Sequence, residues 1–245
     1  ELRALLDSVR TSGFARLHAL WTLDGLKLLT PADLAIASQD LTPVVRRDAA
    51  QLIRTQVSDS AELQHIAAML CRDADDEVRM QAILSLNVST DEAKIAILSA
   101  VPSCLGHIWL QRALLIAAPN IAGDMAEVVV RHSTDSTEFT ARGEFLKSLA
   151  INVAARGDVD QMQKAAMLIG SSAESGLWWQ TALVIGLADG LPRCQNPEIP
   201  KTLAALLQSP PESLKESLQA AAKVVQVAAE TAVNNHHSDA DRVAA

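Results

Sequence analysis

A short pattern of apolar and long polar residues returns about every 33 residues along this chain. In each copy an apolar residue precedes a long polar one, and apolar residues follow that polar one three and seven positions later. The clearest copies are Val45-Arg46-Ala49-Ile53 and Val78-Arg79-Ala82-Leu86. Weaker copies centre on Arg16, Gln111, Arg142, Gln180 and Lys215. Such a period is typical of stacked helix pairs, because one pair cannot bury its own apolar face without a neighbour. We therefore predict an all-α fold, a right-handed α–α superhelix (a solenoid) of about seven antiparallel helix pairs.

The helices themselves are predicted from apolar residues at i, i+3, i+4 and i+7, as in Leu63, Ile66, Ala67 and Leu70. No period-two alternation of useful length occurs, so we expect essentially no strand. Prolines stand at the predicted junctions, where they do not interrupt a helix. The predicted pairs are 2–10 with 14–29, 31–38 with 43–56, 60–71 with 75–88, 91–101 with 106–118, 121–132 with 137–155, 158–172 with 176–190, and 198–208 with 212–231.

These pairs predict one solenoid domain over residues 1–233, followed by a polar tail at 234–245 that we expect to fray. The repeats fall at about 1–29, 30–57, 58–89, 90–119, 120–156, 157–191 and 197–232. The chain opens directly on a helical pattern at Glu1, without an initiator Met. We expect it to be an excised piece of a longer protein.

Composition narrows the classes of partner. The net charge is −8 and the basic residues are dispersed, which argues against a nucleic-acid partner, since that affinity depends on clustered Lys and Arg. No apolar run reaches the roughly 18 residues that a membrane span needs, so we expect no direct membrane insertion. Cys71, Cys104 and Cys194 have no close spacing, and we predict that they are small buried apolar residues.

The two clearest copies of the pattern also carry an Asp six residues before the Arg, at Asp40 and Asp73. This Asp…Val-Arg…Ala spacing resembles the HEAT repeat of the armadillo-like helical proteins. The resemblance implies a structural ladder in which Asp and Arg side chains link successive repeats. The positions concerned are Asp40, Arg46, Asp73 and Arg79, with Arg16 and Arg142 as members that lack an Asp six residues before them.

A narrower resemblance rests on three segments. They are 15–26, which contains Trp21 and Asp24-Gly25-Leu26, then Trp109-Leu110-Gln111-Arg112-Ala113, and then Trp178-Trp179-Gln180 leading to Gly186–Leu191. They are similar to the HEAT segment of exported, membrane-bound dehydrogenase proteins of planctomycete-type bacteria, where it lies between a sugar-dehydrogenase-like propeller and a cytochrome c domain. The resemblance implies an exported or periplasmic parent protein. Haem c, and a quinone, would belong to its missing neighbouring domains and not to this segment.

The tryptophans are candidates for contact with a partner. Trp21 and Trp179 lie on the second helix of their pairs, the layer that lines the concave wall of a solenoid, and Trp109 lies close by. Trp21, Trp109 and Gln180 are the residues we expect on such a face. For Trp179, which takes the apolar position before Gln180, core packing is the preferred interpretation.

Two other groups of residues are weaker candidates for a metal or haem site. Cys104 and His107 would leave a metal site two ligands short, and a covalent haem needs Cys-x-x-Cys-His. His236 and His237 lie in the polar tail. We predict no catalytic, cofactor-binding or metal-binding residue. The expected function is a non-catalytic scaffold that contacts a protein or neighbouring domains of its own chain. The alternatives are a HEAT-like DNA alkylation-repair glycosylase, which uses Trp and Asp in a basic cleft, and a stand-alone protein-binding or lyase-type HEAT protein.

Overall fold

The structure is a computed structural model that describes residues 1–8, 10–56, 60–132, 139–171 and 177–233. Within these ranges all regular structure is helical, with fourteen α-helices, three short 3-10 turns and no strand. The all-α prediction is therefore confirmed for the described part of the chain. The tail at 234–245, with His236 and His237, lies outside the described residues.

The described residues group into two compact units. The first comprises Glu1–Ala100 and His107–Ala118, and the second comprises Val101–Gly106 and the residues from Pro119 onward. Helix α7 (Asp91–Cys104) passes from one unit to the other. The two units are described in turn.

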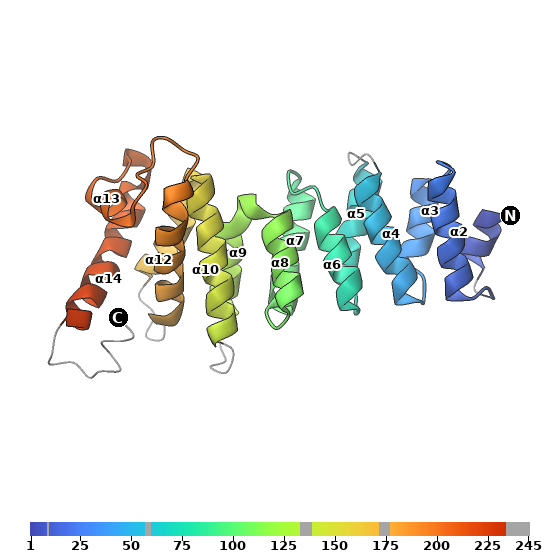
Figure 1. Cartoon of the computed structure of the whole chain (residues 1–245), viewed down its shortest axis with the longest axis horizontal. Helices are drawn as coiled ribbons and strands as arrows, with labels where there is room; N and C mark the ends of the chain where they lie inside the picture. The colour runs from blue at the N-terminus through green and yellow to red at the C-terminus, as the bar shows by residue number, and fades with distance from the viewer. Residues whose placement is uncertain (9, 57–59, 133–138, 172–176, 234–245) are drawn as a thin grey trace. The chain divides into compact units, whose positions relative to one another are not determined.

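The first unit contains two layers of helices (Figure 1). Four helices that pack each on the next form layer B: α2 (Gly13–Gly25), α4 (Pro43–Thr55), α6 (Asp76–Ser85) and α8 (Ile108–Ala117). Layer A holds α1 (Leu2–Asp7), α3 (Pro31–Ser38) and α5 (Ala61–Leu70), which also pack in sequence order, and the first part of α7. Each helix of layer A precedes its layer B partner in the chain, as the periodicity predicted.

Side-chain caps begin many of these helices. At α3 the Thr30 hydroxyl accepts from the Asp33 backbone amide while the Asp33 side chain accepts from the Thr30 amide, a complete capping box. Ser12, Ser60 and Asp75 cap α2, α5 and α6 in the simpler way. These caps satisfy the first amides of each helix and fix where it starts.

The apolar positions of the repeat form the core of both units. Ala49 and Ile53 after Arg46, and Ala82 after Arg79, are at most 1% exposed. The three cysteines are buried and free of disulfides, as predicted.

The second unit contains a 3-10 turn (Pro119–Ile121) and helices α9 (Ala122–Arg131), α10 (Phe139–Arg156), α11 (Val159–Gly170) and α12 (Leu177–Gly190). Here α10 packs on α12, while α9 packs on α11. The chain continues through a 3-10 turn (Leu191–Arg193), α13 (Leu203–Gln208), a further 3-10 turn (Glu212–Leu214) and α14 (Lys215–Val233).

Three features differ from the sequence prediction. Helix α7 continues past Pro102 to Cys104, so it ends three residues later than predicted and contains a proline in its last turn. Helix α13 begins at Leu203 and not at 198, because Thr202 supplies the cap after Pro200. Helix α14 was predicted as the second helix of a seventh pair. Its main packing partner is instead α11, which was predicted as the first helix of the sixth pair.

Candidate functional site

The ladder positions come together at the loops that precede the layer B helices of the first unit. The Arg46 guanidinium donates to both carboxylate oxygens of Asp73, at 2.7 Å each, and to the Asp40 carbonyl at 2.7 Å. Arg16 likewise donates to both oxygens of Asp40, one at 2.8 Å. Each arginine thus reaches the aspartate of the following helix pair.

The aspartates of these links are held in the charged form. Hydrogen bonds from Arg46 lower the pKa of Asp73, against the opposite effect of burial. Burial would raise the pKa of Asp40, but hydrogen bonds from Arg16 and from the Thr42 backbone amide bring it below its usual range. Both carboxylates also accept a backbone amide two residues later, Thr42 and Asp75, which shapes the turn into the next helix. These two carboxylates have a structural role, because their oxygens already accept hydrogen bonds from arginine and from the backbone.

Arg79 does not form such a link. It pairs with Asp76 in its own helix and donates to the Asp73 carbonyl at 3.3 Å, and the next pair has Leu105 at the position six residues before Gln111, where an aspartate would stand. Arg142 lies 3.5 Å from the His132 carbonyl. The links from an arginine to the aspartate of the following pair therefore join the first three helix pairs, and Arg16, which lacks its own preceding Asp, is the first member.

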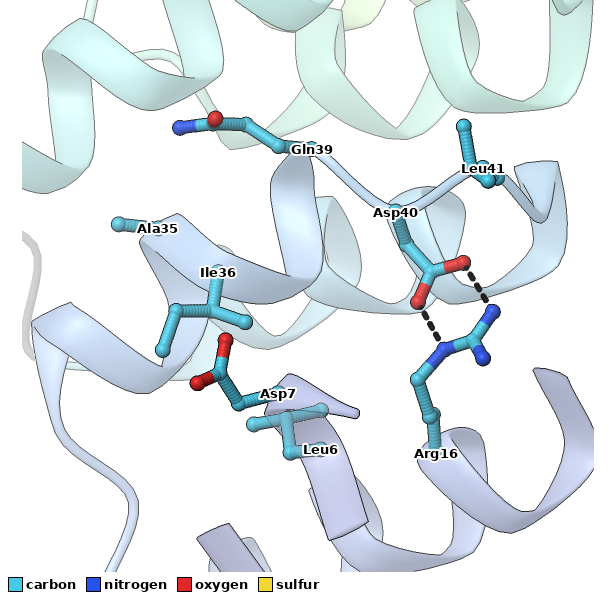
Figure 2. Close-up of a pocket in the computed structure, with 8 residues that line it drawn as sticks. All are labelled: Leu6, Asp7, Arg16, Ala35, Ile36, Gln39, Asp40 and Leu41. Carbon is cyan, nitrogen blue, oxygen red and sulfur yellow. Dashed lines mark hydrogen bonds and ion pairs between the residues drawn. The ribbon is translucent and has the colours of Figure 1, made fainter. Parts of the chain in front are cut away.

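A cavity of 310 Å³ opens beside the first link, and Figure 2 shows the residues that line it. The Arg16 guanidinium on its wall turns to Asp40 and also donates to the Thr11 carbonyl and the Thr42 hydroxyl. These bonds engage all its donor groups. Asp7 and Gln39 are the other polar side chains of the lining. The cavity lies between α1, α2, α3 and the loop that follows α3, and Arg16 on its wall is already paired with Asp40.

Layer B of the first unit presents a second cluster, which the sequence did not reveal. The Trp21 indole N–H on α2 donates to the Asp48 carboxylate on α4 at 2.7 Å. Arg47 donates to the other oxygen of Asp48 at 2.7 Å and to Glu77 on α6 at 3.0 Å. The hydrogen bond to Asp48 is the main reason why the pKa of Arg47 is raised. This network joins three consecutive helices across their outer surface.

Aromatic side chains flank the network. Trp21 is 38% exposed, Phe14 on α2 is 74% exposed, and Trp109 on α8 is 65% exposed with the Arg112 guanidinium 4.8 Å from its ring centre. We call the exposed surface formed by these residues with Arg47 and Glu77 the layer B face. Large aromatic and arginine side chains of this kind are the residues that dominate binding energy at protein interfaces.

Gln180 is not part of an exposed face, contrary to the sequence expectation. It is 8% exposed, and its amide donates to the carbonyls of Ile169 and Ser171 at the end of α11. Gln180 occupies the position that arginine takes in the clearest copies of the pattern. Its buried side-chain amide donates to carbonyl groups at a helix end that have no partner within the helix. Trp179 is buried, as predicted, and its ring meets that of Trp178 edge to face.

The remaining candidates do not converge. Cys104 is fully buried, whereas His107 is exposed, with its Nδ1 3.0 Å from the Asp76 carboxylate. No group of three or more His, Cys, Asp or Glu side chains suited to a metal ion occurs among the residues described. In the described ranges no single helix is long and apolar enough to cross a membrane, and one bent pair of consecutive helices, α8 with the segment Pro119–Arg131, has that length and composition only when taken together.

A comparison with protein-family models, with curated proteins and with solved structures finds no match to the chain.

Proposed function

We propose that this chain is a non-catalytic interaction module, a HEAT-like solenoid whose layer B face binds a partner protein or a neighbouring domain of its own chain. The observation that carries the proposal is that helices of layer B present three exposed aromatic side chains, Phe14, Trp21 and Trp109, with Arg112 over the Trp109 ring and Arg47 in the network of Trp21. Exposed aromatic side chains are costly to leave in water, and a partner that covers them gains their apolar area.

The polar network gives this face a fixed shape before any partner arrives. Trp21, Asp48, Arg47 and Glu77 hold one another across three helices. A preorganised surface loses less side-chain entropy on binding, so more of the contact energy appears as affinity. The Arg46–Asp73 link also connects α4 to the loop before α6, the two helices that carry Arg47 and Glu77.

A photo-crosslinking experiment in the source cells tests this role. p-Benzoylphenylalanine replaces Trp109 on the layer B face or, as a matched control, the exposed Ala32 on α3 of layer A. We expect a discrete crosslinked species from position 109 that disappears when Trp21→Ala is added. Equal crosslinking from the two positions, or products indifferent to Trp21, would refute the layer B face as the interaction surface.

The parent protein belongs to the same proposal. The resemblance of the Trp-containing segments supports a place between a propeller and a cytochrome c domain in an exported protein, with haem c bound by the neighbouring domain. The full reading frame tests it directly. A signal peptide upstream and a Cys-x-x-Cys-His downstream are expected, and a frame with neither would remove the parent assignment while leaving the scaffold role intact.

One observation favours a second candidate, the HEAT-like DNA glycosylase. Trp21 lies beside the carboxylate of Asp48, the pairing that such an enzyme needs. However, Asp48 is 5% exposed and both its oxygens accept hydrogen bonds, and Arg47 is neutralised by Asp48 and Glu77. A gel shift with alkylated duplex DNA at low salt separates the two functions. A salt-sensitive shift would show DNA binding, and release of the alkylated base that Asp48→Asn abolishes would establish the enzyme in place of the scaffold.

A further inference from the structure

A groove of 410 Å³ lies in layer A of the first unit, between α5 and the first turns of α7. Its lining residues from α5 are His65, Ala68 and Met69, whose spacing of three and four places them on one helix face, and Arg72 follows two residues after the helix ends. From α7 come Glu92, Ile95 and Ala96, again at spacings of three and four. The groove is separate from the layer B face, because it is built from the other set of helices.

The middle of the groove is apolar and open to solvent. Met69 is 66% exposed and Ile95 is 62% exposed, so two large apolar side chains stand in water on its two sides. Ala68 and Ala96 between them have side chains of a single methyl group, which leaves the space that the groove occupies. Neighbouring exposed apolar side chains around a depression are typical of a surface that another molecule covers.

The two ends of the groove carry opposite charge. Arg72 stands at the carboxyl end of α5, and no described residue pairs with its guanidinium. At the other end the first turn of α7 contains Glu92, which lines the groove 2.7 Å from His65 Nδ1, and Asp91, which lies next to it 3.5 Å from Lys94 Nζ. The positions of His65 and Arg72 are about 10 Å apart along the helix, or two helical turns.

We propose that this groove binds a short amphipathic α-helix of another protein, antiparallel to α5. The apolar residues of that helix, at i, i+3 or i+4, and i+7, lie between Met69 and Ile95. Its first turn carries an acidic residue that meets Arg72, and its last turn carries a basic residue that meets Asp91 and Glu92. Acidic first turns and basic last turns are also what the helix dipole favours, so an ordinary capped helix fits this charge pattern. The inference adds a second binding surface and does not depend on the layer B face.

Fluorescence anisotropy with a designed peptide tests the proposal on the full chain. The probe is a labelled Ala/Gln peptide of about 16 residues, long enough for appreciable helicity. It carries Leu at i, i+4 and i+7, Glu in its first turn and Lys in its last. A second peptide exchanges the Glu and Lys residues, and a third scrambles the Leu positions. We expect the first peptide to bind more tightly than the other two.

Matched variants then locate the binding. Ile95→Asp should weaken the first peptide by about tenfold or more, because the lost apolar burial exceeds the 1.4 kcal/mol that corresponds to a factor of ten. Arg72→Glu should abolish the preference between the first two peptides, because each of them then meets one attractive and one repulsive charge. Ile116→Asp is the control, because Ile116 is 71% exposed on α8 of layer B. Circular dichroism confirms that each variant stays helical.

Several results would overturn the proposal. Unchanged affinity in Ile95→Asp, or equal affinity for the scrambled peptide, would show that the groove does not hold the helix. A sedimenting dimer that Ile95→Asp dissociates would show that a second copy of the chain occupies it instead. Failure of the layer B crosslinking leaves this test unaffected, because Trp109 and Trp21 contribute nothing to the groove.

Discussion

Replacing Arg46 with alanine isolates one link of the ladder. The Arg46 and Asp73 side chains are 16% and 9% exposed, and the guanidinium makes three hydrogen bonds of 2.7 Å, two of them to Asp73. Removing one partner of a buried ion pair costs about 3–5 kcal/mol, because a charge is left buried without compensation. Water reaches part of this pair and recovers some of that loss. We therefore expect Arg46→Ala to reduce the free energy of unfolding by about 2–4 kcal/mol.

Urea unfolding combined with amide hydrogen exchange measures this loss and its location. The control is Arg54→Ala on the same helix, where the side chain is exposed and the expected change is within about 0.5 kcal/mol. In stacked helix pairs the damage stays near the altered pair. Amides of α4 and α6 should therefore lose protection, while those of α10 and α12 keep it. Equal effects of the two substitutions, or a uniform loss of protection in both units, would refute the reasoning.

The same pair predicts a pH dependence. The folded-state pKa of Asp73 is lowered, chiefly by its hydrogen bonds from Arg46. The stabilisation is therefore complete above the unfolded-state pKa of about 3.9 and disappears as the pH falls through the folded-state value. The difference in stability between the parent chain and Arg46→Ala should be constant from neutral pH down to about pH 5 and should shrink below pH 4. A difference that grows on acidification would contradict the assignment.

Two further substitutions test the second unit. In Gly190→Ala the new Cβ would lie 2.6 Å from the Ile151 carbonyl oxygen, so we expect a loss of about 1–3 kcal/mol in thermal unfolding. Gly25→Ala is its control, because nothing lies within 4 Å of that Cβ. Gln161→Ala removes the side-chain oxygen that accepts from the Gly123 backbone amide at 2.8 Å. It also removes the hydrogen bond that the Gln161 side-chain amide donates to the Asp124 carboxylate. It should cost about 1–2 kcal/mol, with lost exchange protection at the start of α9.

Helices and core were accessible to sequence reasoning because both depend on local spacing. The predicted helix at 43–56 is observed at Pro43–Thr55, and that at 31–38 at Pro31–Ser38. The apolar positions at three and seven residues after the long polar residue are buried because a helix places them on one face. Caps such as Thr30 and Ser60 mark the starts of helices for the same local reason.

The candidate site was less predictable because its members come from different helices. Asp48 lies two residues after Arg46, and its sequence context gives no sign that Trp21 and Arg47 converge on its two oxygens. Likewise, the arginine slot predicts a polar residue at Gln180 but not the carbonyls at the end of α11 that bury it. Which side chains pair with one another depends on how neighbouring helices are packed, and a single sequence does not give that packing.

The position of α14 shows why a repeat period identifies helices more reliably than it orders them. Leu214, just before the helix, and Leu218 within it fit the repeated pattern and are buried, yet the helix packs along α11. Two 3-10 turns and the short α13 separate α12 from α14, and this longer connection allows the chain to change layer. Gly170 on α11 permits the close approach, because a Cβ there would lie 2.5 Å from the Cβ of Ala220 on α14. An apolar helix face requires an apolar surface to cover it, and α11 supplies that surface for α14. The seventh copy of the pattern therefore packs on α11, and its place in the repeat order does not determine its partner.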